Sequence, residues 1–167
     1  MSPQDIRDAD WMREEKSFLQ WDPSISLLRS IRSHQKNRAK TGGISTISRK
    51  LASLRWCFWS IVTGTDISKE AKLGGGLILP HPNGVVIHEK AVIGVNCMIM
   101  QQVTIGQLAD EGAPILGSNV YIGAGAKVLG DISIGDNVSI GANAVVLVDV
   151  PDNSTAVGVP AKVIKKS

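Results

Sequence analysis

The sequence predicts a mainly β protein, a parallel β-helix of about four coils preceded by a short α-helical region. An aliphatic residue recurs every six positions between residues 67 and 151, with only two breaks in the spacing. Small or β-branched residues lie four positions further on, and glycine often follows the aliphatic residue directly. This pattern is typical of coils of about 18 residues, each built from three short flat faces. The aliphatic positions are Ile67, Leu73, Leu79, Ile87, Ile93, Ile99, Ile105, Leu116, Ile122, Val128, Ile134, Ile140 and Val146.

The composition indicates one globular domain with a modest extension. The chain has 167 residues, of which 43% are hydrophobic and 20% charged, and its formal net charge is +3. That charge is too small to indicate a nucleic acid partner. No apolar run is long enough to span a membrane, and the acidic, polar N-terminus differs from a secretory signal, so we expect a cytoplasmic protein.

Residues 1–62 lack the repeat and are expected to be helical. Apolar residues at three- or four-residue spacing predict one or two helices around residues 18–31 and a further helix from Ile47 to Val62, separated at Thr41-Gly42-Gly43. Between Asp22 and Asp66 there are basic residues and no acidic ones.

Two interpretations of the basic segment, residues 29–62, are open. It could contact an anionic membrane surface peripherally. We favour the second interpretation, in which the apolar face of the second helix packs on the β-helix or on a partner subunit. That face comprises Leu51, Leu54, Phe58, Ile61 and Val62.

Residues 63–167 are expected to form the β-helix and its C-terminal cap. The regular coils should begin near Asp66 and end near Pro151, followed by a turn and a closing strand. Because an open end of a β-helix exposes unpaired backbone groups, we expect the N-terminal helices to cover the opposite end. Cys97 falls on an inward position and is expected to be a buried small hydrophobic residue.

The first break in the repeat contains Pro80-His81-Pro82-Asn83-Gly84. Prolines on both sides fix the backbone around His81, and histidine exchanges protons near neutral pH. A stiff turn on a regular scaffold favours a general base over a solvated turn residue. Asp66 lies fifteen residues earlier, a little less than one coil, so stacking should bring its carboxylate near the imidazole. The alternative is an aspartate that caps the first coil.

The second break, residues 106–114, is long enough to form a projecting loop that wraps a neighbouring subunit or covers a ligand. We assign no chemistry to Asp110 or Glu111 within it. His88 is expected at the surface, and His34, in a basic polar run, is expected to be solvated. The three histidines are separated and lack a cysteine or carboxylate cluster, so no metal site is predicted.

The stretch from about residue 64 to residue 164 resembles the bacterial serine acetyltransferases. The matching segments are TDISKEAKLGGGLILPHPNGVVIHEKAVIG, QQVTIG, IGAGAKVLGDISIGDNVSIGANAVVLVDVP and TAVGVPAKVI. The resemblance implies a left-handed β-helix that assembles as a homotrimer and transfers acetyl from acetyl-CoA to a hydroxyl group. It extends to shorter enzymes of this kind that acetylate sugars.

The resemblance also implies roles for individual residues. The catalytic histidine falls on His81 and its aspartate partner on Asp66, and a glutamate of the substrate pocket falls on Glu89. Backbone near Gly106, Ala124 and Ala142 would line a cleft for CoA between two subunits. Lys162 falls where the family carries a base near the nucleotide phosphate.

Three groups that hold serine in that family are missing here. An aspartate before the catalytic histidine is replaced by Pro80, and an arginine and histidine of the projecting loop are replaced by Gly112 and Ala113. The helical region that joins two trimers is reduced to about sixty residues. The C-terminal tail that docks into cysteine synthase is absent, so we expect no complex with that enzyme.

We therefore expect an acetyl-CoA-dependent O-acetyltransferase whose small acceptor is a sugar or glycan precursor of polysaccharide biosynthesis, in preference to L-serine. Three alternatives stay open. The first is a genuine serine O-acetyltransferase of cysteine biosynthesis, with an acceptor pocket rebuilt around Glu89 and Asn83. The second is an N-acetyltransferase acting on an amino-sugar. The third is a non-catalytic β-helix that serves as an assembly module.

Overall fold

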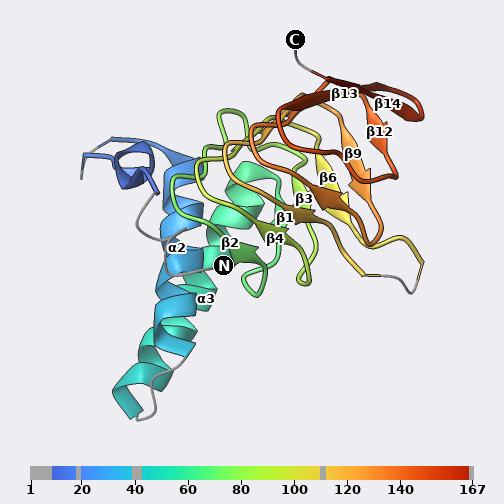
Figure 1. Cartoon of the computed structure of the whole chain (residues 1–167). Helices are drawn as coiled ribbons and strands as arrows, with labels where there is room; N and C mark the ends of the chain where they lie inside the picture. Colours follow the sequence, from blue (N-terminus) through green and yellow to red (C-terminus); the bar gives the residue numbers. More distant parts are fainter. Residues whose placement is uncertain (1–8, 18–19, 39–42, 110–111, 166–167) are drawn as a thin grey trace.

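The computed structural model describes residues 9–17, 20–38, 43–109 and 112–165, and within them it shows a β-helix with a pair of helices at its N-terminal end (Figure 1). A single 3-10 turn, η1 (Trp11–Glu14), precedes two α-helices, α2 (Pro23–Arg38) and α3 (Gly43–Thr63). The two helices pack against each other as a hairpin that projects beyond the coils. The expected break between them falls largely on residues 39–42, which lie outside the described ranges.

Three parallel faces of short strands form the coils. The first face contains β1 (Asp66–Ile67), β3 (Val86–Ile87), β6 (Thr104–Gly106), β9 (Lys127–Leu129) and β12 (Val145–Val146). The second contains β2 (Lys72–Leu73), β4 (Val92–Ile93), β7 (Ile115–Leu116) and β10 (Ser133–Ile134). The third contains β5 (Met98–Ile99), β8 (Tyr121–Ile122), β11 (Ser139–Ile140), β13 (Ser154–Gly158) and β14 (Ala161–Lys165).

The register follows the hexapeptide repeat. Ile87 pairs with Ile67 on one side and with Ile105 on the other, so aliphatic residues stack directly from coil to coil. Each two-residue strand turns its second residue inward, and all thirteen aliphatic positions of the repeat are at most 4% exposed. Their burial confirms the predicted core. Cys97 is also fully buried, and this burial raises the pKa of its thiol to about 11 from 9.0.

The corner between the second and third faces is built from glycine and asparagine. Asn96, Asn119, Asn137 and Asn153 all have φ between 54° and 59°, a left-handed conformation that asparagine tolerates. Their amides form a ladder in which Asn119 donates to Asn137 at 3.3 Å and Asn137 donates to Asn153 at 3.1 Å. Two residues before Asn96, a Cβ on Gly94 would lie only 2.2 Å from the carbonyl oxygen of Gly117 on the next coil. Glycine is therefore required at position 94.

The helices close the N-terminal end of the β-helix, as expected from the sequence. Leu27, Leu28 and Ile31 of α2 join the apolar core of the coils. The guanidinium of Arg32 donates to the carbonyl oxygens of Leu73 and Gly74 and pairs with Glu14 at 2.8 Å. Glu14 in turn accepts from the backbone N–H of Leu77 at 3.1 Å. These side chains supply partners for backbone groups that the first coil would otherwise leave unpaired.

The orientation of α3 contradicts one half of the favoured interpretation, packing of this face on the β-helix of the same chain, whereas packing on a partner subunit stays a prediction. Ala52 is buried, and the Trp56 indole donates to the carbonyl oxygen of Ile67 at 2.9 Å, so this side of the helix faces the coils. The face expected to pack inward is exposed instead, with Leu54 at 67% and Phe58 at 56%. Its packing on the β-helix of the same chain was thus predicted wrongly. The helix has apolar residues on both sides, and the indoles take the inward position.

The C-terminal segment caps the other end as an antiparallel hairpin of β13 and β14, in which β13 also continues the third face beside β11. The expected turn and closing strand are both present within it. None of the described helices is long and apolar enough to cross a membrane.

Candidate active site

The turn that carries His81 is anchored at its base. Gly84 donates its N–H to the carbonyl oxygen of Gly64 at 2.8 Å, and Val85 donates to that of Pro82 at 3.1 Å. The side-chain oxygen of Asn83 accepts from Gln102 on the next coil at 3.0 Å. His81 itself is exposed, and its side chain has no hydrogen bond to any described residue. A fixed backbone with a free imidazole is the arrangement that a general base needs.

His81 faces a hollow of about 460 Å³ between its turn and the helices. The hollow is lined by Trp21, Asp22, Pro23, Ser24, Val62, Thr63, Pro80, His81, Pro82 and Asn83. The predicted residues His81, Pro80 and Asn83 are therefore brought together, and the N-terminal region supplies the opposite wall.

Asp22 lines this hollow and was not singled out from the sequence. It directly precedes α2, and its Oδ1 atom accepts from the Ile25 N–H at 2.9 Å and from the Ser24 hydroxyl at 2.8 Å. These contacts are those of a helix N-cap followed by proline at the first helical position. Its Oδ2 atom accepts no hydrogen bond from the described residues. The Asp-Pro-Ser signal predicts the cap, but nothing in it places the carboxylate opposite His81.

Asp66 and Glu89 line a different hollow, of about 380 Å³, beside the first face. Its lining comprises Asp66, Ser68, Val86, Ile87, His88, Glu89, Ile105, Gly106 and Gln107. Asp66 is the outward residue of β1, is exposed, and lacks a side-chain hydrogen bond to the described residues. Within one chain, His81 and Asp66 thus line different hollows, and no hydrogen bond or ion pair joins their side chains. Their pairing stays a prediction.

The corner that carries His81 joins the third face to the first, and two of the predicted CoA-lining residues stack along it. Gln102 donates its N–H to the carbonyl oxygen of Asn83 at 3.0 Å, which places the second coil directly on the histidine turn. On the coils above, Asn143 donates its N–H to the carbonyl oxygen of Ala124 at 2.8 Å. Ala124 and Ala142 therefore lie on the corner of His81, with successive coils about 4.8 Å apart.

The other two predicted cofactor contacts lie elsewhere. Gly106 is the last residue of β6, whereas the corner of His81 precedes the strands of the first face. Its carbonyl oxygen accepts from the Gly130 N–H at 3.0 Å. Lys162 is exposed on β14 and pairs with Val157 in the C-terminal hairpin.

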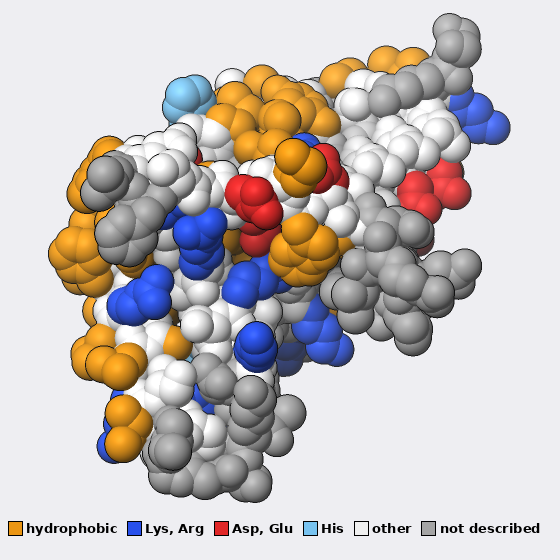
Figure 2. Space-filling view, turned by 90° about the vertical axis from the view of Figure 1, so that its left-hand side faces the viewer, with side chains coloured by type: hydrophobic (Ala, Val, Ile, Leu, Met, Phe, Trp, Pro, Cys, Tyr) orange, Lys and Arg blue, Asp and Glu red, His pale blue; other side chains and the backbone are white. Residues whose placement is uncertain are grey.

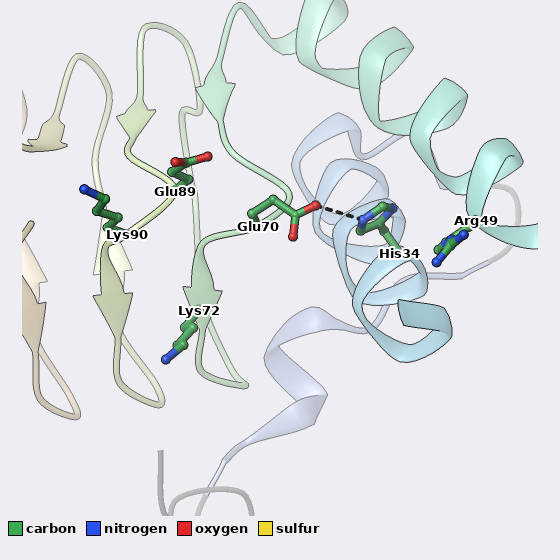
Figure 3. Close-up of a pocket in the computed structure, with 6 residues that line it drawn as sticks. All are labelled: His34, Arg49, Glu70, Lys72, Glu89 and Lys90. Carbon is green, nitrogen blue, oxygen red and sulfur yellow. Dashed lines mark hydrogen bonds and ion pairs between the residues drawn. The ribbon is translucent and has the colours of Figure 1, made fainter. Parts of the chain in front are cut away.

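A third hollow, of about 550 Å³, lies between the helices and the first two coils (Figure 3). It is lined by His34, Arg49, Glu70, Lys72, Glu89 and Lys90. His34 is only 8% exposed, its Nε2 atom lies 3.2 Å from Glu70, and its Nδ1 atom lies 3.2 Å from the Ser53 hydroxyl. The expectation of a solvated His34 was wrong, because the partner carboxylate comes from a β-helix corner that local sequence does not connect with α2.

The second break is a loop at the corner between the first and second faces. Its residues Asp110 and Glu111 lie outside the described ranges. Ala113 is buried, and a Cβ on Gly112 would lie 2.5 Å from a carboxylate oxygen of Asp131. Within the described ranges, no three His, Cys, Asp or Glu side chains converge on a common point as metal ligands would.

Comparison with known proteins gives one consistent result. The family model "Bacterial transferase hexapeptide (six repeats)" matches residues 113–147. A serine acetyltransferase of Synechococcus elongatus is 49% identical over 110 residues, which cover 64% of this chain and 45% of the relative. A serine acetyltransferase of Staphylococcus aureus is 44% identical over 136 residues, which cover 80% and 59%. The chain spans about half the length of the curated relatives it matches.

Solved structures agree in fold. A soybean serine acetyltransferase complexed with serine superposes with a TM-score of 0.73 at 37% identity, covering 85% of this chain and 57% of the other. A Brucella abortus serine acetyltransferase in complex with coenzyme A gives a TM-score of 0.75 at 32% identity, covering 98% and 65%. These matches, with the three-faced coils and their hexapeptide register, lead to one assignment. The chain belongs to the serine acetyltransferase-like family of left-handed β-helix acetyltransferases.

Proposed function

We propose that this chain is an acetyl-CoA:L-serine O-acetyltransferase that acts as a homotrimer. The relatives named above are serine acetyltransferases, and the solved neighbours include one complexed with serine and one with coenzyme A. These comparisons support L-serine over the sugar or glycan precursor that the missing serine-binding groups had suggested. The use of acetyl-CoA is consistent with the cytoplasmic location expected from the sequence.

The observation that carries the proposal is the hollow that His81 shares with Asp22. An amino acid substrate presents an ammonium group that needs an acidic partner. Pro80 cannot supply one, but Asp22 lines the same hollow, and its Oδ2 atom accepts no hydrogen bond from the described residues. The carboxylate comes from the helical region, so the loss of an aspartate next to His81 does not exclude serine as the acceptor.

The carboxylate of serine requires a different contact. The residues that line the His81 hollow include no lysine or arginine. A neighbouring subunit of the proposed trimer would supply the cation, as expected for a site that lies between subunits. This requirement links substrate binding to assembly, and it predicts that a monomeric form would be inactive.

In the proposed reaction, His81 accepts the proton of the serine hydroxyl as the oxygen attacks the thioester carbonyl of acetyl-CoA. The carbon–sulfur bond breaks, and the departing thiolate takes up the proton from the imidazolium. Asp66 orients the ring and stabilises its charged form once the subunits and substrates are in place. Binding both substrates at one corner supplies much of the remaining acceleration.

The cofactor would extend along the corner of His81, over Ala124 and Ala142. Lys162 would bind a phosphate, since an ammonium group suits that charge. Gly106 is proposed as a further cofactor contact, whereas Glu89 is proposed as a contact of the acceptor substrate.

The test is thiol release from acetyl-CoA with L-serine, homoserine and a panel of sugars and nucleotide sugars. His81→Ala should lower turnover by about 10²–10⁴ while the oligomer stays intact. Ile164→Ala, at an exposed residue of the C-terminal cap that lines none of the three hollows, is the control and should stay close to wild type. Wild-type turnover in His81→Ala would overturn the site, and turnover with a sugar alone would restore a glycan acceptor. Absence of both turnover and CoA binding would favour a non-catalytic module.

A further inference from the structure

The outer face of α3 is a continuous apolar stripe that no described residue covers. Its members follow one another at alternating spacings of four and three residues, which places them on one side of an α-helix. They are exposed by 56–77%: Ile47, Leu51, Leu54, Phe58 and Ile61. Contiguous apolar surfaces of this kind on soluble proteins mark an interaction site.

The outward orientation of this face is fixed by contacts on the opposite side of the helix. Ala52 is buried there, and Trp56 is bonded to the backbone of Ile67. Trp59 packs against Trp21 with ring centroids 5.5 Å apart. Turning the stripe inward would break these contacts. The stripe is therefore presented by the fold, and no residue of the described ranges serves as its partner.

The charges around the stripe select the kind of partner. Lys50 and Arg55 are both exposed, and at 100° per residue they lie on the two edges of the stripe. No aspartate or glutamate occurs from residue 23 to residue 65. Figure 2 shows basic and hydrophobic side chains together over the helical end, with the acidic ones nearer the coils. A second copy of α3 would bring like charges together, whereas an anionic surface would attract them.

We propose that the outer face of α3 lies on a membrane surface rich in anionic lipid headgroups. The apolar stripe enters the boundary between headgroups and acyl chains, and Lys50 and Arg55 extend to the lipid phosphates on either side. The helix lies in the membrane plane, since none of the described helices has the length and hydropathy to cross it.

The projecting hairpin makes this contact sterically feasible. In Figure 1, the free end of the hairpin of α2 and α3 extends beyond the coils, so the β-helix of the same chain does not lie over that part of α3. The hollow of His81 borders α3 at Val62, but none of the five residues of the stripe lines it. Membrane contact and acetyl transfer can therefore be tested independently, and failure of one does not imply failure of the other.

The test is co-sedimentation of the full chain with vesicles of phosphatidylcholine alone or with about 30% phosphatidylserine. The wild type should bind the anionic vesicles, and binding should fall in high salt. A Leu54→Ser/Phe58→Ser double variant should reduce partitioning on the order of a hundredfold, because both side chains lose their apolar contact. Ile164→Ser, which alters an equally exposed aliphatic residue on the C-terminal cap, should leave binding unchanged.

Two charge-reversal variants test the electrostatic contribution to membrane binding. Lys50→Glu should weaken binding to anionic vesicles by at least about fivefold, the effect expected for one cation near the surface. Lys165→Glu makes the same change in charge on the exposed end of β14 and should have little effect. Because all of these side chains are exposed, each variant should retain the circular dichroism spectrum of the wild type.

Cys57 offers a second readout on α3 itself. It is the exposed cysteine of the two, and Cys97 is buried. An environment-sensitive fluorophore on Cys57 should shift its emission to the blue with anionic vesicles. Equal or absent binding to the two vesicle types, with no shift, would overturn the proposal. If Leu54→Ser/Phe58→Ser instead lowered the mass measured by light scattering, a second copy of the chain would be the partner.

Discussion

Replacement of Gly94 by alanine should destabilise the β-helix severely, because the corner leaves no space for a methyl group. The added Cβ would lie 2.2 Å from the Gly117 carbonyl oxygen, and contacts of this type are rarely shorter than 3.0 Å. The coils must therefore separate locally by about 0.8 Å. The same movement lengthens the bond from the Gly94 N–H to the Leu116 carbonyl oxygen from 2.9 Å to about 3.7 Å, beyond hydrogen-bonding range.

The cost follows from these two effects. Overpacking in a well-packed region costs about 1–3 kcal/mol, and a lost backbone hydrogen bond adds about 1 kcal/mol. Gly94→Ala should thus lower the free energy of unfolding by about 3 kcal/mol. In a chain of this size, that corresponds to a decrease in Tm of roughly 6–12 °C.

Urea unfolding followed by circular dichroism measures this change. Gly106→Ala is the matched control, because a Cβ there would make contacts no shorter than 3.7 Å. It should remain within about 0.5 kcal/mol of wild type, as expected for a substitution without such features. An equally small effect in Gly94→Ala would refute the argument from close approach of the coils.

Three further predictions concern titration, the N-terminal closure and substrate binding. Burial raises the pKa of Cys97 from 9.0 to about 11, so its contribution to stability is complete below pH 9. The thiol ionises at lower pH in the unfolded chain than in the folded one, so the free energy of unfolding should fall by on the order of 2 kcal/mol between pH 9 and 11. Urea unfolding at several pH values measures this decrease. It should be absent in Cys97→Ala and present in the control Cys57→Ser. Glu14→Gln should lower the free energy of unfolding by about 2–3 kcal/mol, since the half-buried Arg32 loses its carboxylate; an equal loss in Glu15→Gln, at an exposed neighbour, would contradict this. Asp22→Asn should raise the KM for L-serine at least about tenfold in steady-state assays without changing the KM for acetyl-CoA, because asparagine keeps the helix cap but not the charge. An unchanged KM for serine would exclude the ion pair.

The coils could be predicted from the sequence because their period is set locally. One residue of each two-residue strand must point inward, so the pattern of Ile87, Ile93 and Ile99 specifies both the face and the register. The turn at His81 was also recognisable, since an interruption with two prolines has no place in a regular coil. In both cases the signal lies within a few adjacent residues.

The parts that could not be predicted depend on contacts between distant segments. Both sides of α3 carry apolar residues, and only the bond from Trp56 to Ile67 shows which side faces the coils. Similarly, His34 and Glu70 are 36 residues apart, and no local pattern relates them. Asp22 could be recognised as a helix cap, but its place opposite His81 depends on how α2 docks on the first coil. Pairing of His81 with Asp66 stays a prediction.

The repeated pairing between coils makes a whole coil an interchangeable unit of this protein. Tyr121 and Ser139 occupy equivalent positions in neighbouring coils, and the strands on either side keep the same relation. Removing residues 121–138 would join Val120 to Ser139. Ser139 would then take the position of Tyr121, and the strands that follow would pair with the strands of the preceding coil in the same register. Because the helices and the hairpin close the two ends separately, neither depends on the number of coils between them. Length can therefore change in steps of one coil, with stability altered by roughly the contribution of that coil and its interfaces.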